Sequence, residues 1–188
     1  MNVIAGAVFL FSVASCWAQP HVSSASSLAK VMTEAASYFN DVRTGTGYSM
    51  VQAESHINKI KLFCDDPMPD TGLSDEEISD ACMLRAVIAG EISKYLSKDF
   101  KMGQASEYGR QWLFFLKRAI RLNPKNQKAV LFHANRIKDF RELFFAKRLV
   151  VEKSLQTKLE DEWDLALVFL KNAGLRVEDV GKHPIVKH

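Results

Sequence analysis

Apolar residues recur along most of this chain at alternating spacings of three and four positions, which is the pattern of amphipathic helices. Between 48 and 64 this stripe consists of Met50, Ala53, Ile57, Ile60 and Cys64. The same period predicts further helices at 27–42, from 74 to at least 96, and at 104–122, 125–138, 142–155 and 159–173. No stretch alternates apolar and polar residues between turn signals, as a half-buried strand would. The sequence therefore predicts an all-α fold, an antiparallel array of six to seven helices.

Capping and helix-breaking residues indicate where these helices begin and end. Ser74 and Glu77 have the spacing of a capping box that opens the third helix. Pro124 ends the fourth helix, and Gly174 follows the last one as a left-handed C-cap. We expect a short turn near Asp139 between the helices at 125–138 and 142–155. The last helix has little polar face, so we expect it to be buried.

The first eighteen residues form an uncharged apolar run that ends in small residues, which is typical of an export signal. Its apolar stretch of about a dozen residues is too short to cross a bilayer core, which needs about 20. We therefore divide the chain into a signal peptide at 1–18, a flexible N-terminal tether at 19–26, a single all-α domain at 27–177 and a C-terminal tail at 178–188. The expected localisation is periplasmic or secreted.

Three fates of this run remain open from the sequence. Cleavage after Ala18 would leave Gln19 as the new N-terminus and release a soluble protein. Val13, Ala14, Ser15 and Cys16 alternatively resemble a bacterial lipobox, which implies a lipid on Cys16 and attachment to the envelope. In the third case the run stays uncleaved as an anchor.

Charge is unevenly distributed, although the whole chain has a net charge of only +3. Residues 19–100 carry seven Lys and Arg against twelve Asp and Glu, whereas residues 101–158 carry fourteen against four. This asymmetry predicts a basic central region that binds an acidic protein partner or an anionic membrane surface. We expect no nucleic acid partner, because an exported protein seldom meets nucleic acid.

Cys64 and Cys82 are the only cysteines certain to survive processing, because Cys16 either leaves with the signal peptide or has its sulfur occupied by lipid. An even pair in an oxidising compartment predicts a disulfide bond. The seventeen residues between them contain no histidine, and the five histidines of the chain are isolated from one another. The sequence has no nucleophile elbow or comparable catalytic motif. We therefore expect no metal, no cofactor and no catalysis.

Residues 119–150 resemble tetratricopeptide repeats, helical hairpins with a period of about 34 residues. The resemblance rests on Ala119, Leu122, Asn123, Pro124, Asn126 and Ala129, which are spelled like the joint between two units. Counted from Gln127, small or apolar residues also stand at the eighth, eleventh and twentieth positions. Trp112, Phe100 and Lys158 depart from the pattern. The resemblance implies a groove for a peptide or protein, lined by Lys128, Leu131, Asn135 and Lys138.

These observations favour an exported, non-catalytic helical scaffold or adaptor that binds a protein or peptide partner. A lipid-anchored or anionic-surface-binding envelope protein is the first alternative. An enzyme of unknown type is the second.

Overall fold

A computed structural model of the chain describes residues 25–44, 49–65, 72–146 and 153–181. The predicted signal peptide, Cys16 and most of the predicted tether lie outside these ranges. None of the helices in this part of the chain is long and apolar enough to cross a membrane.

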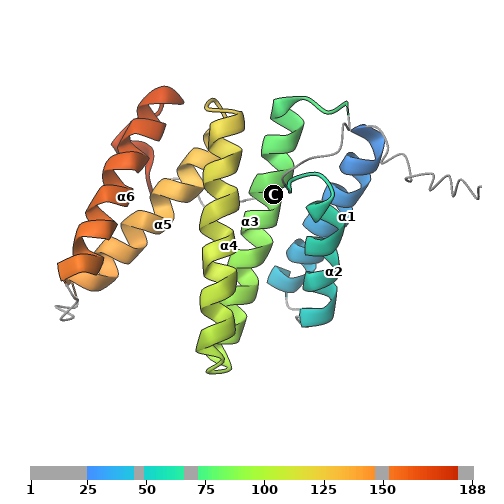
Figure 1. Cartoon of the computed structure of the whole chain (residues 1–188), viewed down its shortest axis with the longest axis horizontal. Helices are drawn as coiled ribbons and strands as arrows, with labels where there is room; N and C mark the ends of the chain where they lie inside the picture. Colours follow the sequence, from blue (N-terminus) through green and yellow to red (C-terminus); the bar gives the residue numbers. More distant parts are fainter. Residues whose placement is uncertain (1–24, 45–48, 66–71, 147–152, 182–188) are drawn as a thin grey trace, which may run out of the picture.

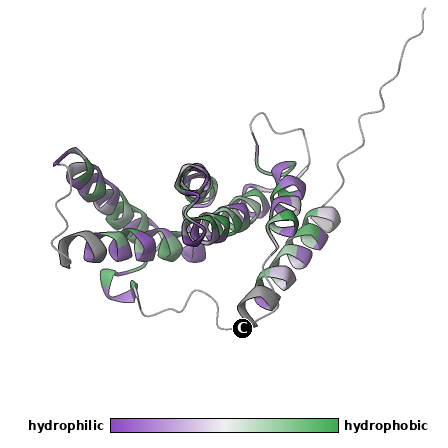
Figure 2. Ribbon diagram, turned by 90° about the horizontal axis from the view of Figure 1, so that it is seen from below, coloured by the Kyte–Doolittle hydropathy of each residue, from purple (hydrophilic) through white to green (hydrophobic). Residues whose placement is uncertain are grey.

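The described residues confirm the all-α fold and contain six α-helices and one short 3-10 helix. Figure 1 shows the α-helices as three antiparallel pairs that lie side by side, with α3 and α4 in the middle. Figure 2 shows apolar and polar residues interspersed along each helix, as expected of amphipathic helices. In chain order the elements are α1 (Ala25–Thr44), α2 (Met50–Lys61), α3 (Asp75–Lys98), α4 (Met102–Leu122), α5 (Gln127–Ala146), α6 (Lys153–Asn172) and η1 (Val177–Asp179).

The predicted turn near Asp139 is wrong, because α5 runs without interruption from Gln127 to Ala146. Asp139 is exposed on this helix, where an acidic side chain costs little and breaks no backbone hydrogen bond. Lys138 and Glu142 form an i,i+4 ion pair across the same turn, with 3.7 Å between Nζ and Oε1. The structure therefore has one helix, α5, in place of most of the two helices predicted at 125–138 and 142–155, and the end of the second falls in the start of α6.

The prediction that the last helix is buried is also wrong. In α6 only Ala166 and Leu170 are buried, and Val168 exposes 53% of its surface. The helix lies at one end of the array and packs mainly on α5, so it has one covered side (Figure 1). A strongly apolar composition thus does not specify burial when there is a neighbour on one side only.

The hydrophobic core is continuous from Leu28 in α1 to Val180 after η1, and α3 lies at its centre. Val180 belongs to the segment that the sequence assigned to the C-terminal tail, and this residue is packed in the core, whereas Glu178 is exposed. The closest packing is between α3 and α4, where the Ser79 hydroxyl donates to the carbonyl of Ala119 at 2.8 Å.

Asn126 joins this central pair to α5. Its Oδ1 accepts from the backbone N–H of Ala129 at 3.1 Å and caps the N-terminus of α5. Its Nδ2 donates to Ser79 Oγ at 3.0 Å and to Asp80 Oδ1 at 2.9 Å, both on α3. One side chain therefore sets where α5 starts and how it meets α3.

Candidate functional site

The four groove residues implied by the repeat resemblance do not form one open surface. Lys128 is exposed, but Leu131 packs against the core and Asn135 is buried. The C-terminal segment lies over this side of α5, because the Gly181 N–H donates to Asn135 Oδ1 at 2.6 Å and Lys138 lies against the same glycine. Part of the predicted peptide groove is thus covered by the chain itself.

The predicted disulfide bond is absent, since Cys64 and Cys82 are free thiols that are not at disulfide-bond distance. Both are fully buried, and the Cys64 thiol donates to the carbonyl of Ile60 at 3.3 Å. A hydrogen bond with the Cys82 thiol, helped by the Arg85 guanidinium at 3.5 Å, lowers the pKa of Cys64. The same hydrogen bond and burial raise the pKa of Cys82. The Cys64 sulfur is thus held by Ile60 and Arg85 in the core, and the two cysteines remain thiols.

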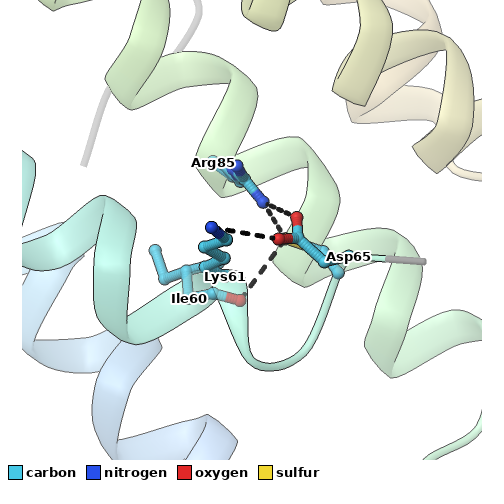
Figure 3. A network of polar contacts seen from close by, with 5 residues as sticks. Ile60, Lys61, Asp65 and Arg85 are labelled. Atoms are coloured by element: carbon cyan, nitrogen blue, oxygen red, sulfur yellow. Dashed lines mark hydrogen bonds and ion pairs between the residues drawn. The ribbon is translucent and has the colours of Figure 1, made fainter. Parts of the chain in front are cut away.

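Arg85 joins this thiol pair to an ionic network at the end of α2. Figure 3 shows the Asp65 carboxylate between the Arg85 guanidinium and the Lys61 ammonium, and the Lys61 pair measures 3.7 Å. The Arg85 guanidinium also lies 3.7 Å from the centre of the Phe115 ring on α4. Arg85 is buried, and the contacts of its guanidinium with Asp65 and Phe115 tie α2, α3 and α4 together, although its Nε has no hydrogen-bond partner.

A buried histidine lies between α4, α5 and α6. The His133 ring is fully buried against Phe169, and its Nε2 is 3.6 Å from Oε2 of Glu162, which pairs with Lys117. Burial lowers the pKa of His133 to about 4, so the ring is neutral at pH 7. A fully enclosed imidazole cannot reach a substrate in this arrangement, so we assign it to the core.

The strongest candidate site is a groove of about 460 Å³ between α3, α4 and α5, within the size range of ligand pockets. Small residues and hydroxyls of α3 and α4 form its walls, and an indole forms its floor. Basic side chains stand on its rim. The residues that carry its chemistry are Gly90, Ser97, Lys98, Trp112, Arg136 and Phe140.

Trp112 on the floor of this groove has a polar atom without a partner. The side chain is 7% exposed, and its Nε1 is buried and makes no hydrogen bond. Leaving a buried donor unpaired costs about 1–3 kcal/mol. Gly90 permits this position, because a Cβ at residue 90 would be 3.2 Å from Cδ1 of the indole. No acceptor in the described part of the chain lies within hydrogen-bond distance of this donor, which is covered from solvent just beneath the surface of the groove.

The rim of the groove has unneutralised positive charge. Among the described residues no carboxylate pairs with Lys98 or Arg136, and Lys94 has only a long exposed contact of 3.9 Å with Glu91. The Arg136 guanidinium lies 5.9 Å from the Trp112 ring centre. Together these groups suit an anionic ligand with an apolar part.

Residues 112 and 136 both lie in the basic central region seen in the sequence, but sequence reasoning did not bring Trp112 and Arg136 together with Lys98. They come from three helices, and only the crossing of α3, α4 and α5 makes them neighbours. The one local signal of this site is a glycine that faces an aromatic residue on the next helix. Glycine occurs within helices for many other reasons, so this signal does not identify a groove.

No protein family, curated protein or solved structure matches this chain. Within the described ranges, no three histidine, cysteine or acidic side chains are grouped as metal ligands. The site must therefore be interpreted from its own chemistry.

Proposed function

We propose that this protein is a non-catalytic helical scaffold that binds an acidic segment of a partner protein in the groove between α3, α4 and α5. The observation that carries the proposal is a pair of cationic side chains without carboxylate partners among the described residues, Lys98 and Arg136, which line the same groove as the apolar indole of Trp112. A glutamate or aspartate side chain supplies the negative charge that these two cations lack. Phe140 and the indole face can cover an apolar neighbour of that carboxylate.

The basic central segment supports a protein partner of acidic character, because it holds ten more positive than negative charges, fourteen against four. Helices stacked as hairpins present such grooves in repeat scaffolds. Membership of the tetratricopeptide family stays a prediction. A repeat unit counted from Gln127 would end near residue 160, which lies inside α6 and not at a helix boundary.

Tryptophan fluorescence tests this proposal, because Trp112 lies on the floor of the groove. Titration with a peptide of several glutamates and one phenylalanine, at low ionic strength, is expected to change the emission of the wild type and of Trp163→Phe. The change should be absent in Trp112→Phe. An unaltered Trp112→Phe response would contradict the groove as the binding site.

A matched pair of charge reversals separates the groove from general attraction. Lys98→Glu with Arg136→Glu should weaken peptide binding by at least about tenfold, since two charge-assisted contacts are reversed. Lys128→Glu with Lys158→Glu changes the net charge equally at exposed positions outside the groove and should leave most of the affinity. Equal losses in both double variants would refute a specific site.

We propose in addition that the chain is exported and loses residues 1–18, with lipidation of Cys16 as the alternative. Its support is the uncharged apolar run that ends in small residues. Mass spectrometry of the protein from its native cells decides between these forms. An N-terminus at Gln19 supports soluble export, a diacylglyceryl group on Cys16 supports the anchored form, and an intact Met1 refutes both.

A further inference from the structure

The turn between α3 and α4 holds a bulky residue in a backbone conformation that favours glycine. Phe100 has a φ of 59° directly after the end of α3. Its N–H donates to the carbonyl of Ser97 at 3.3 Å, and the N–H of Lys101 donates to the carbonyl of Leu96 at 2.9 Å. These are the two hydrogen bonds of a Schellman motif, in which the left-handed position is usually glycine.

The end of α6 shows the same motif with the usual residues. Gly174 has a φ of 72°, and the N–H of Leu175 donates to the carbonyl of Leu170 at 2.9 Å. There the left-handed residue is glycine, and an apolar pair, Leu170 and Leu175, accompanies the turn. The turn after α3 has Phe100 at the left-handed position, which is occupied by Gly174 after α6. It has Lys101 at the position of Leu175. Neither residue stabilises this turn as its counterpart does.

Packing does not compensate for the strain at Phe100, because this side chain is 89% exposed. Met102, two residues later, is 59% exposed. Strained residues tend to persist where the strain serves a function. The α3–α4 turn therefore presents two large apolar side chains to the outside.

The surroundings of this pair are basic. Residues 94–104 hold three lysines, Lys94, Lys98 and Lys101, against one acid, Asp99. The ion pairs Lys94–Glu91 and Lys101–Asp99 each measure 3.9 Å and are exposed, so they hold these lysines weakly. In Figure 1 the turn protrudes beyond the ends of the flanking helix pairs, at the bottom of the view.

We propose that this tip, Phe100 and Met102 with the three lysines, is a membrane-contact site that inserts its two apolar side chains among anionic lipid headgroups. A convex tip of two side chains is too small for a typical protein interface, which buries about 800 Å² per partner. Shallow insertion needs only exposed apolar groups and nearby cations. This site goes beyond the proposed function, although Lys94 and Lys98 also line the neighbouring groove.

Vesicle binding of the full chain tests the proposal. We expect tighter binding to vesicles of phosphatidylcholine mixed with phosphatidylglycerol than to phosphatidylcholine alone, by about fivefold for each lysine that reaches the surface. Phe100→Ser with Met102→Ser should weaken binding to the mixed vesicles by at least about tenfold. Phe114→Ser with Val168→Ser removes two other exposed apolar side chains and should leave it unchanged.

Phe100→Gly separates lipid binding from folding. Glycine relieves the left-handed strain, so this variant should melt at a higher temperature than the wild type and still bind the mixed vesicles more weakly. Unchanged vesicle binding by Phe100→Gly and by the serine pair would overturn the proposal.

A local probe excludes binding through the apolar N-terminal run, which all variants share. In a chain whose own tryptophans are replaced (Trp17→Phe, Trp112→Phe and Trp163→Phe), the fluorescence of Phe100→Trp should be quenched by brominated phosphatidylglycerol chains, whereas that of Phe114→Trp should not. Arg136→Glu should leave that quenching intact, which distinguishes this site from the groove. Equal quenching at residues 100 and 114 would refute a lipid site. So would a result in which a bound protein, but no vesicle, shields residue 100 from solvent.

Discussion

The clearest test of how the groove is built is the replacement Asn126→Ala. Asn126 is buried and makes three hydrogen bonds, one to cap α5 and two to α3. Loss of the cap costs about 1 kcal/mol. The bonds to Ser79 and to the exposed Asp80 are worth about 1 kcal/mol each. The expected loss of unfolding free energy is about 3 kcal/mol.

Urea denaturation followed by far-ultraviolet circular dichroism measures this loss. The midpoint should fall while the slope stays the same, because the folded core is unchanged. For a chain of this length the melting temperature should fall by about 6–12 °C. Asn123→Ala is the matched control. Among the described residues the Asn123 side chain accepts only from the exposed N–H of Lys125 at 3.0 Å, so its loss should cost less than about 1 kcal/mol.

Asn126→Asp separates the two roles of this residue. The aspartate keeps an acceptor for the α5 cap but loses both donors to α3 and places a second carboxylate beside Asp80. We expect a loss close to that of the alanine variant. Equal stability of Asn126→Ala and Asn123→Ala would show that the bonds from Asn126 to α3 do not stabilise the junction of α3 and α5. Wild-type stability of Asn126→Asp would show the same.

Three further predictions concern other parts of the molecule. Phe100→Gly should stabilise the fold by about 1 kcal/mol, since the left-handed conformation costs phenylalanine about 1–2 kcal/mol and the freer unfolded glycine offsets part of the gain; thermal melting measures it, and a lower melting point would contradict the strain. The pKa of His133 is about 4 in the fold against 6.5 in the unfolded chain, so the unfolded chain binds more protons between these values and stability is lost as the pH falls through them. Between pH 7 and pH 5 the loss should be about 2 kcal/mol greater in the wild type than in His133→Asn, as measured by urea unfolding at both pH values; parallel losses would show that His133 does not carry it. Cys64 and Cys82, both buried free thiols, should react with a thiol reagent only after denaturation and then without added reductant, whereas an absence of reaction in denaturant would indicate a disulfide.

Local chemistry made the helices predictable. The capping box of Ser74 and Glu77 is present, with the Ser74 N–H donating to Glu77 Oε2 at 2.8 Å, and Gly174 ends α6 in the left-handed conformation. These features involve residues within a few positions of one another. Their hydrogen bonds form in the same way whatever the rest of the chain does.

The candidate site could not be predicted, because its parts are far apart in the sequence. Lys98, Trp112 and Arg136 belong to three helices, and each has an ordinary local pattern. The groove of Lys128 and Asn135 was implied by the tetratricopeptide resemblance, which carries no information on the C-terminal segment that lies over Asn135.

The sequence by itself determined the helical class, most of the helix ends and the uneven distribution of charge, because periodicity, caps and composition are local properties. Only the tertiary structure decided that α5 continues through Asp139, that Cys64 and Cys82 remain thiols, and that Phe100 is exposed in a strained turn. The thiol state depends on the distance between Cys64 and Cys82, and the exposure of Asp139 and Phe100 depends on which helices pack beside them. Packing sets those distances, and it is a property of the whole chain.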